Sequence, residues 1–223
     1  MPQLHMQQCD LTYEGVFVKP AFSLGDSPGE LCDLLLDALE ALGCTSADLV
    51  LEDGEPAERG VTCQVDELDA RVTLHGDRIE IYCANFATGD AAKMAAVLAN
   101  VWSGLAGLKA GAAPKTHSFQ FEADTEIRGA SYQELLNRLA RAPESLPAGT
   151  ETAVVYYLPA EPGRAYGASS LVLNRSAGVE RGLQVNATLV YEAASMKPAA
   201  AISAAQSRLG ELLRNLGFEW IED

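Results

Sequence analysis

The chain has little that would serve catalysis or metal binding. Its three histidines, His5, His75 and His117, stand far apart, without Cys, Asp or Glu at metal-ligand spacing beside them. A nucleophile elbow, a glycine loop for phosphate and a dinucleotide-binding fingerprint are all absent. We therefore predict no catalytic residue, no metal site and no cofactor, and we expect His75, in a predicted turn, to be exposed to solvent.

Long apolar runs are missing as well. No stretch of 18 apolar residues occurs, and the first ten residues lack a basic region followed by an apolar one. The number of cysteines is odd and their spacing matches no CxxC pair (Cys9, Cys32, Cys44, Cys63 and Cys83). These absences predict a cytoplasmic protein with reduced cysteines and no contact with a membrane.

Basic side chains are scarce and scattered singly. The chain of 223 residues holds 16 Lys and Arg against 31 Asp and Glu, for a net charge of −15. Binding to nucleic acid needs a stripe of positive charge that neutralises phosphates, and this chain offers none. We therefore expect no nucleic-acid partner.

Acidic side chains, in contrast, are concentrated in one segment. From Asp26 to Asp69, thirteen acidic residues and a single basic one, Arg59, give a net charge of −12, which leaves −3 for the rest of the chain. A surface of one sign attracts partners of the other. We predict that it engages a basic or unfolded segment of another protein, through Asp33, Asp37, Glu40, Glu52 and Asp53. The alternative is a solvated surface that only keeps the protein soluble.

Helical and strand periods alternate along the chain and predict an α+β fold with helices packed on one face of antiparallel sheet. Helices are expected at 27–43, 88–107, 131–142 and 198–216, the first and third opened by capping boxes at Ser27 and Ser131. Strands 154–158 and 171–173 are continuously apolar, which predicts a central position. The side chains expected in the core include Leu35, Leu98, Trp102, Val185 and Leu212.

The order of the elements is the same in two parts of the chain. Each part reads as strand, capped helix, further strands and a long helix, with the capping serines at positions 27 and 131. We predict an acidic half at 1–113 and a second α+β half at 114–223, which share one core. Whether the halves are true internal repeats stays open, since no identity of residues supports it.

The segment from about 30 to 111 resembles one known family. A leucine-rich helix is followed by Leu49-Val50-Leu51, by Cys63-Gln64-Val65-Asp66, by a hairpin at 72–83 and by a helix that contains Leu98-Ala99-Asn100-Val101-Trp102. This order resembles the small acidic chaperones of type III secretion effectors. The resemblance implies a homodimer that holds an unfolded client without ATP, although the extra first strand and the greater length depart from that family.

Three functions of different class follow from these observations. The first is a non-enzymatic adaptor or chaperone-like protein that binds another protein through its acidic face, with a possible homodimer. The second is a small-molecule-binding module with a cleft between duplicated halves, lined by Tyr156, Tyr157 and Tyr166. The third is an enzyme whose site the sequence does not reveal.

Overall fold

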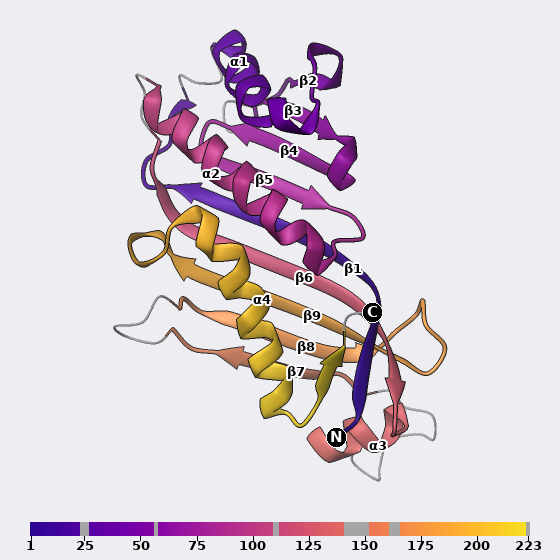
Figure 1. Ribbon diagram of the computed structural model, residues 1–223. Helices are drawn as coiled ribbons and strands as arrows, with labels where there is room; N and C mark the ends of the chain where they lie inside the picture. Colours follow the sequence, from indigo (N-terminus) through magenta and orange to yellow (C-terminus); the bar gives the residue numbers. More distant parts are fainter. Residues whose placement is uncertain (23–26, 56–57, 109–111, 141–151, 161–165, 222–223) are drawn as a thin grey trace.

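The computed structural model describes residues 1–22, 27–55, 58–108, 112–140, 152–160 and 166–221. These residues form the predicted α+β fold (Figure 1). The helices are α1 (Pro28–Leu39), α2 (Ala91–Gly107), α3 (Tyr132–Leu139) and α4 (Pro198–Asn215). The strands are β1 (Gln3–Phe17), β2 (Leu49–Glu52), β3 (Gly60–Val65), β4 (Ala70–His75), β5 (Arg78–Cys83), β6 (Pro114–Arg128), β7 (Val154–Leu158), β8 (Ser169–Arg175), β9 (Gly182–Glu192) and β10 (Glu219–Ile221).

All ten strands belong to one sheet, in the order β2-β3-β4-β5-β1-β6-β9-β8-β7. The two long strands β1 and β6 run antiparallel at its middle, paired from Gln3 with Arg128 to Phe17 with Pro114. The short strand β10 lies parallel to the first residues of β1. β1 is the first strand of one half and β6 is the first strand of the other. The two halves therefore join through the pairing of these two strands.

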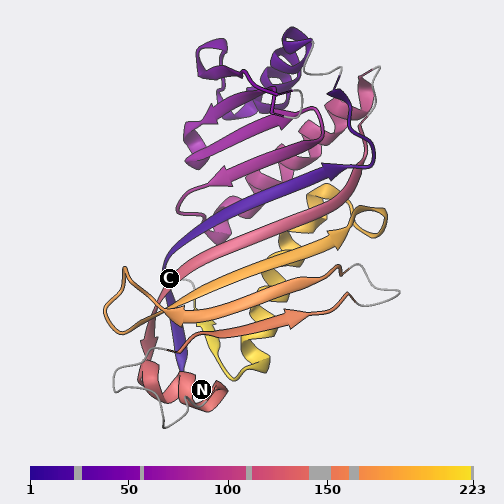
Figure 2. The same cartoon turned by 180° about the vertical axis from the view of Figure 1, so that it is seen from behind.

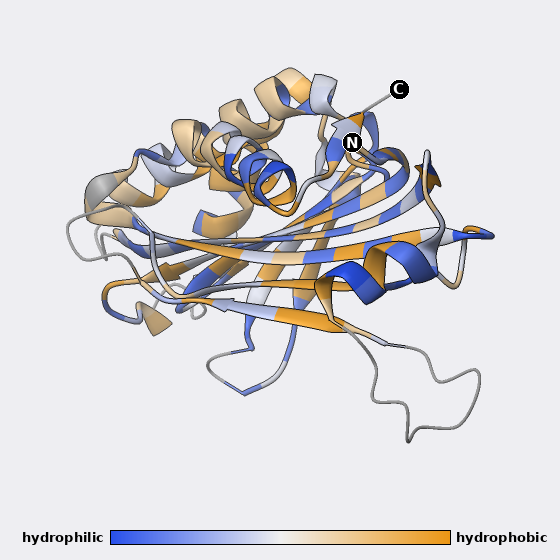
Figure 3. Cartoon of the chain, turned by 90° about the horizontal axis from the view of Figure 1, so that it is seen from below, coloured by the Kyte–Doolittle hydropathy of each residue, from blue (hydrophilic) through white to orange (hydrophobic). Residues whose placement is uncertain are grey.

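Helices α1, α2 and α4 cover one face of this sheet (Figures 1 and 2). Figure 3 shows these three helices as a layer on one side of the strands. The strand sequences agree with this arrangement, because buried and more exposed side chains alternate along them: in β6, Phe119 and Phe121 are buried while Gln120 and Glu122 are exposed. The core thus lies between the sheet and the three helices.

The two halves place their elements in mirrored order about the β1–β6 pair. One half contributes β3-β4-β5-β1 and the other β6-β9-β8-β7, and each has a helix after its first strand and another after its last long strand. Leu35, Leu98 and Val185, from both halves, are fully buried in a single cluster of apolar side chains, and Trp102 is 5% exposed. Leu212 is only partly buried, because Leu209 and Leu213 take the inward positions of α4. Common descent of the halves stays a prediction.

One of the two predicted capping boxes forms. The Ser131 hydroxyl accepts a bond from the Glu134 amide at 3.2 Å, and the Glu134 carboxylate accepts one from the Ser131 amide at 2.8 Å. At Ser27 the prediction is wrong, because its side chain makes no capping hydrogen bond and α1 begins with Pro28 and Gly29. A proline at the first helical position already removes one of the donors that a cap would satisfy.

The central position predicted for 154–158 is wrong as well. β7 is an edge strand, and β8 lies between β7 and β9. Val155 and Tyr157 point away from the helices and are 45% and 83% exposed. Because these outward side chains are apolar, the strand shows no polar alternation although only one of its faces is covered.

His75 is buried, at 7% exposure, and not solvated as we expected. Residues 21 and 22 lie over the β4–β5 turn, where a side chain added at Gly76 would meet Phe22 at 3.0 Å. The His75 ring itself packs against β3, where its Nδ1 would lie 3.1 Å from a Cβ added at Gly60. A turn that another segment covers cannot be recognised from its own residues.

A hydrogen-bonded trio lies in the core under α2. The Trp102 Nε1–H donates to the Tyr13 hydroxyl at 2.9 Å, and that hydroxyl lies 2.8 Å from His117 Nδ1. Tyr13 and His117 are both fully buried. Burial lowers the pKa of His117 to about 4, against a smaller opposite effect of the Met196 backbone. The imidazole is therefore neutral in the folded protein at neutral pH.

We expect His117 to make the protein acid-sensitive. Between about pH 6.5 and 4 the unfolded chain binds a proton at this residue that the folded chain does not, so the free energy of unfolding falls as the pH falls. Once the pH is below 4, the protonation of His117 has lowered the free energy of unfolding by about 3 kcal/mol. Urea titrations of the protein and of His117→Gln at pH 7 and pH 4.5 measure it. Equal pH dependence in both proteins would show that His117 does not cause it.

Candidate functional site

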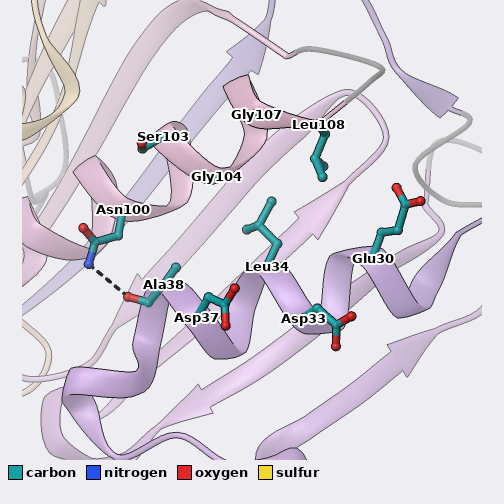
Figure 4. A pocket seen from close by; sticks show the side chains of 10 residues that line it. All are labelled: Glu30, Asp33, Leu34, Asp37, Ala38, Asn100, Ser103, Gly104, Gly107 and Leu108. Carbon is teal, nitrogen blue, oxygen red and sulfur yellow. Dashed lines mark hydrogen bonds between the residues drawn. The ribbon is translucent and has the colours of Figure 1, made fainter.

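A groove of about 630 Å³ runs between α1 and α2 on the outer side of the helical layer. Figure 4 shows the ten side chains and backbone positions that line it. α1 contributes Glu30, Asp33, Leu34, Asp37 and Ala38, and α2 contributes Asn100, Ser103, Gly104 and Gly107, with Leu108 just after it. A volume of this size falls in the range of small-molecule sites.

The α1 side of the groove carries three carboxylates. Glu30, Asp33 and Asp37 are separated by three and four residues, which places them along one side of a helix. All three are exposed. None of the ten lining residues is a lysine or an arginine, so nothing among them offsets this negative charge.

The floor of the groove is apolar and tightly closed. Leu34 and Leu108 point toward each other between the helices (Figure 4). α2 approaches α1 closely at Gly104, where an added Cβ would lie 2.9 Å from Leu34 Cγ. At one end the Asn100 side-chain amide donates to the Ala38 carbonyl at 3.2 Å, which satisfies a carbonyl in the last turn of α1. The groove therefore has a fixed width.

The direction of α2 adds to the negative potential. Ser103, Gly104 and Gly107 belong to the last two turns of α2, and the C-terminal end of a helix carries a partial negative charge from unpaired carbonyl groups. Of the three carboxylates, Glu30 lies nearest this end, whereas Asp37 lies beside Ala38 and Asn100 at the other end of the groove (Figure 4). The site as a whole therefore favours a cation.

The structure brings only part of the predicted binding set together. Asp33 and Asp37 line the groove. Glu40 is exposed beyond the end of α1 and does not line it. Glu52 and Asp53 lie at a separate hollow of about 60 Å³ that also contains Arg59, and Glu52 accepts a hydrogen bond from Thr62 at 2.9 Å. The five residues are therefore not one site.

Three polar residues of the groove, Glu30, Asn100 and Ser103, were not in the predicted set. Glu30 belongs to the same row of α1 as Asp33 and Asp37, at helical spacing, and this signal was present in the sequence. After Lys93, Asn100 and Ser103 are the polar side chains of α2, at a spacing of three. Such polar interruptions indicate an edge of the buried stripe, but they do not reveal which helix packs beside it.

Within the described residues, the three tyrosines do not line one cleft between the halves. Tyr157 projects from the outer face of β7, and Tyr166 packs against Tyr191, with the Arg208 guanidinium 4.7 Å from the centre of its ring. The hollow that does lie between the halves, beside Phe86, Phe121 and Trp220, measures only about 20 Å³. This hollow is too small for the predicted small-molecule site.

The described ranges contain no group of three or more His, Cys, Asp or Glu placed to hold a metal ion. Burial raises the pKa of Cys63 to about 12 and that of Cys83 to about 11, so these thiols stay protonated at neutral pH.

Within the described ranges, none of the helices has both the length and the apolar character needed to span a bilayer.

Comparison with known proteins adds a structural likeness. No protein-family model matches the chain, and no curated protein matches it. Among solved structures, the rolling circle replication initiator protein from Geobacillus stearothermophilus matches with 10% sequence identity over 96% of this chain and 84% of that one, at a TM-score of 0.38.

This likeness runs against two of our expectations. The matching protein is a replication initiator and not a chaperone or adaptor, so we withdraw the non-enzymatic protein-binding function and, with it, the expected partners: another protein and no nucleic acid. A TM-score of 0.38 is too low to transfer the role of that protein to this chain. The resemblance to type III effector chaperones is not tested by it.

Proposed function

We propose that the protein binds a linear organic polycation of the polyamine class in the groove between α1 and α2. The observation that carries the proposal is the row of carboxylates of Glu30, Asp33 and Asp37 above an apolar floor. Ammonium groups pair with carboxylates, and the transfer of methylene segments from water to an apolar surface is favourable. A polyamine combines both kinds of group along one chain.

The spacing of the carboxylates supports a linear triamine. With a helical rise of about 1.5 Å per residue, separations of three and four residues span about 4.5 and 6 Å along α1. Amines separated by three and four methylene groups lie about 5 and 6 Å apart in an extended chain, given carbon–carbon and carbon–nitrogen bonds of about 1.5 Å. Successive ammonium groups can therefore meet successive carboxylates.

The floor and the far wall support the same ligand. Leu34 and Leu108 offer apolar surface to the methylene segments. Ser103 and the carbonyl groups at the end of α2 offer oxygen acceptors to N–H groups that face away from α1. Metal cations would gain nothing from the apolar floor, which favours an organic cation over them.

The state of the cysteines bears on the compartment in which the protein acts. All five cysteines are free, three of them buried. Free cysteines are typical of the reducing cytoplasm, where thiol reductants prevent disulfide formation. We propose that the protein acts there.

Calorimetric titration with a triamine that has propylene and butylene spacers tests the proposed function. We expect a dissociation constant of about 100 µM at low salt, because exposed ion pairs contribute little each. Asp33→Asn combined with Asp37→Asn is expected to weaken binding about tenfold or more. Glu40→Gln, which removes an acid just beyond α1 and outside the groove, serves as the matched control and should leave binding unchanged.

Two comparisons show whether the groove and not general charge is responsible. Magnesium chloride at equal charge should compete poorly, and binding should weaken above about 0.5 M sodium chloride as charges are screened. Equal binding by the Asp33/Asp37 double variant, or displacement of the triamine by magnesium at equal charge, would refute the proposal.

Ser103→Lys is a second test of the same groove. Ser103 is exposed on α2, so the substitution should not disturb the fold. The new ammonium group can reach the carboxylates across the groove and take the place of the ligand. We expect triamine binding to be lost and the thermal unfolding temperature to stay within a few degrees of the parent.

A further inference from the structure

We propose that Cys44 and Cys63 are a site of oxidative modification, at which a low-molecular-weight disulfide converts the two thiols into a reversible disulfide bond. Cys44 lies in the segment that joins α1 to β2, and Cys63 belongs to β3. Figure 1 shows α1, β2 and β3 together at one end of the molecule. The bond ties the end of α1 to the sheet.

The two thiols lie side by side. The Cys44 thiol donates to the Gln64 carbonyl oxygen at 3.6 Å, and the Cys63 thiol donates to the same oxygen at 3.6 Å. The two side chains also form a hydrogen bond with each other. A disulfide forms only where two sulfur atoms can approach without a large movement of the backbone. Thiols that are already in contact meet this condition.

The backbone holds both cysteines in place. Gly43, with a φ of 74°, ends the turn that follows α1. Directly after Cys44, the Thr45 amide and hydroxyl donate to the Asp48 carboxylate at 2.7 Å and 2.9 Å. Cys63 is fully buried, and its strand pairs with β2 on one side and β4 on the other. The two sulfur atoms are thus carried by fixed segments.

The exposure of the two cysteines assigns their order of reaction. Cys44 is partly exposed and Cys63 is not exposed at all. A dissolved disulfide therefore reaches Cys44 first. The Cys44 thiolate attacks one sulfur of the reagent, the S–S bond of the reagent breaks, and its other half leaves as a thiolate with the electron pair.

Cys63 completes the oxidation inside the protein. It loses its proton and attacks the Cys44 sulfur of the mixed disulfide, and the second half of the reagent leaves. Two protein thiols are oxidised to one disulfide and one molecule of reagent is reduced to two thiols, which take up the two protons. Cys63 can react although it is buried, because the sulfur that it attacks lies beside it.

The surroundings of the pair make this oxidation slow at neutral pH. Burial raises the pKa of both thiols, that of Cys63 to about 12, and the charges of Asp48 and Asp66 add to the rise at Cys44. Only a thiolate attacks a disulfide, so the rate should rise about tenfold from pH 7 to pH 8. The pair is therefore reduced in an ordinary cytoplasm and is oxidised under sustained oxidising conditions.

Thiol counting on the full-length chain tests the inference. The reduced protein is incubated at pH 8 with oxidised 2-mercaptoethanol, a neutral disulfide, and is then alkylated in denaturant and weighed by mass spectrometry. We expect the five free thiols to decrease by two, with no mercaptoethanol left attached. Trypsin cuts after Arg59 and Arg71, so Cys63 lies on a peptide with no other cysteine, and this peptide should be linked to the one that contains Cys44.

Cys44→Ser separates this pair from the other cysteines. Serine has nearly the same size but cannot form a disulfide, so the variant should fold and should show no linked peptide. Cys32→Ser changes the partly buried cysteine of α1 and is the matched control. It should form the link at the same rate as the parent.

The oxidised protein should also be more stable. The bond closes residues 44–63 into a loop of about 20 residues, which restricts the unfolded chain and should raise the thermal unfolding temperature by about 5 to 10 °C. Dithiothreitol should return the unfolding temperature to its original value.

Three results would overturn the inference. The first is that all five thiols stay free, or that only a mixed disulfide with 2-mercaptoethanol accumulates. The second is that the Cys63 peptide is linked as extensively in Cys44→Ser as in the parent. The third is a fall in the unfolding temperature on oxidation, which would mean that the fold does not hold the two sulfur atoms ready for the bond.

Discussion

Expressed separately, residues 1–111 and 114–223 are expected not to fold, although each fragment has the length of a small domain. The cut separates β1 from β6, the two 15-residue strands at the centre of the sheet. Each fragment would expose the whole edge of one of these strands and one side of the shared core. Co-expression of the fragments should restore the sheet.

Urea unfolding followed by circular dichroism measures the effect. We expect no cooperative transition in either fragment alone and a sharp one in the co-expressed pair. The full-length chain with a protease-cleavable insertion at the same place is the control, since its sheet forms before the cut. Two soluble fragments that each unfold sharply and do not bind each other would show that the halves are independent domains.

Gly15→Ala is expected to lower the free energy of unfolding by about 4 kcal/mol, through overpacking together with the loss of buried hydrogen bonds. Gly15 lies beside the buried trio in β1, and an added Cβ would meet the Tyr13 hydroxyl and lie 2.6 Å from Trp102 Cζ2. The methyl group can be accommodated only if Tyr13 or Trp102 moves. That movement breaks the hydrogen bonds that join Trp102, Tyr13 and His117.

Gly210→Ala is the matched control for this substitution. Gly210 lies in α4, and an added Cβ would meet nothing within 4 Å. The same chemical change should there raise the free energy of unfolding by about 0.5 to 1 kcal/mol, because alanine favours the helix. Urea titrations of the two variants give both values. A loss of less than about 1 kcal/mol for Gly15→Ala would mean that the trio is loosely packed.

The local parts of the fold were predictable because their causes lie in neighbouring residues. Ser131 and Glu134 form a capping box through atoms three residues apart, and the buried stripes of α1 and α2 follow from helical spacing. The order of the strands was not predictable in the same way. A period of two, as in β6, shows which face of a strand is covered, but it does not show which strands pair with it, and the sequence of β7 lacks even this alternation.

The candidate site, too, was predictable only where its residues are close together in the sequence. Asp33 and Asp37 were predictable as neighbours because a single helix carries both. Asn100 and Ser103 join them only because α2 packs beside α1 at Gly104, a contact between residues far apart in the chain. Glu52 and Asp53 share the acidic segment but lie at another hollow, since net charge along a sequence says nothing about position in space.

The apolar edge strand β7 has a consequence for how the protein behaves in concentrated solution. Its sequence, Val-Val-Tyr-Tyr-Leu, contains no charge and no proline, and it exposes Val155 and Tyr157 beside an edge that no described strand occupies. An edge of this kind attracts the edge of another molecule, and the net charge of −15 opposes that approach. Acid that protonates the carboxylates removes the repulsion while β7 stays in place. Colloidal stability is thus governed by the acidic residues of the first half, whereas the surface that would aggregate belongs to the second.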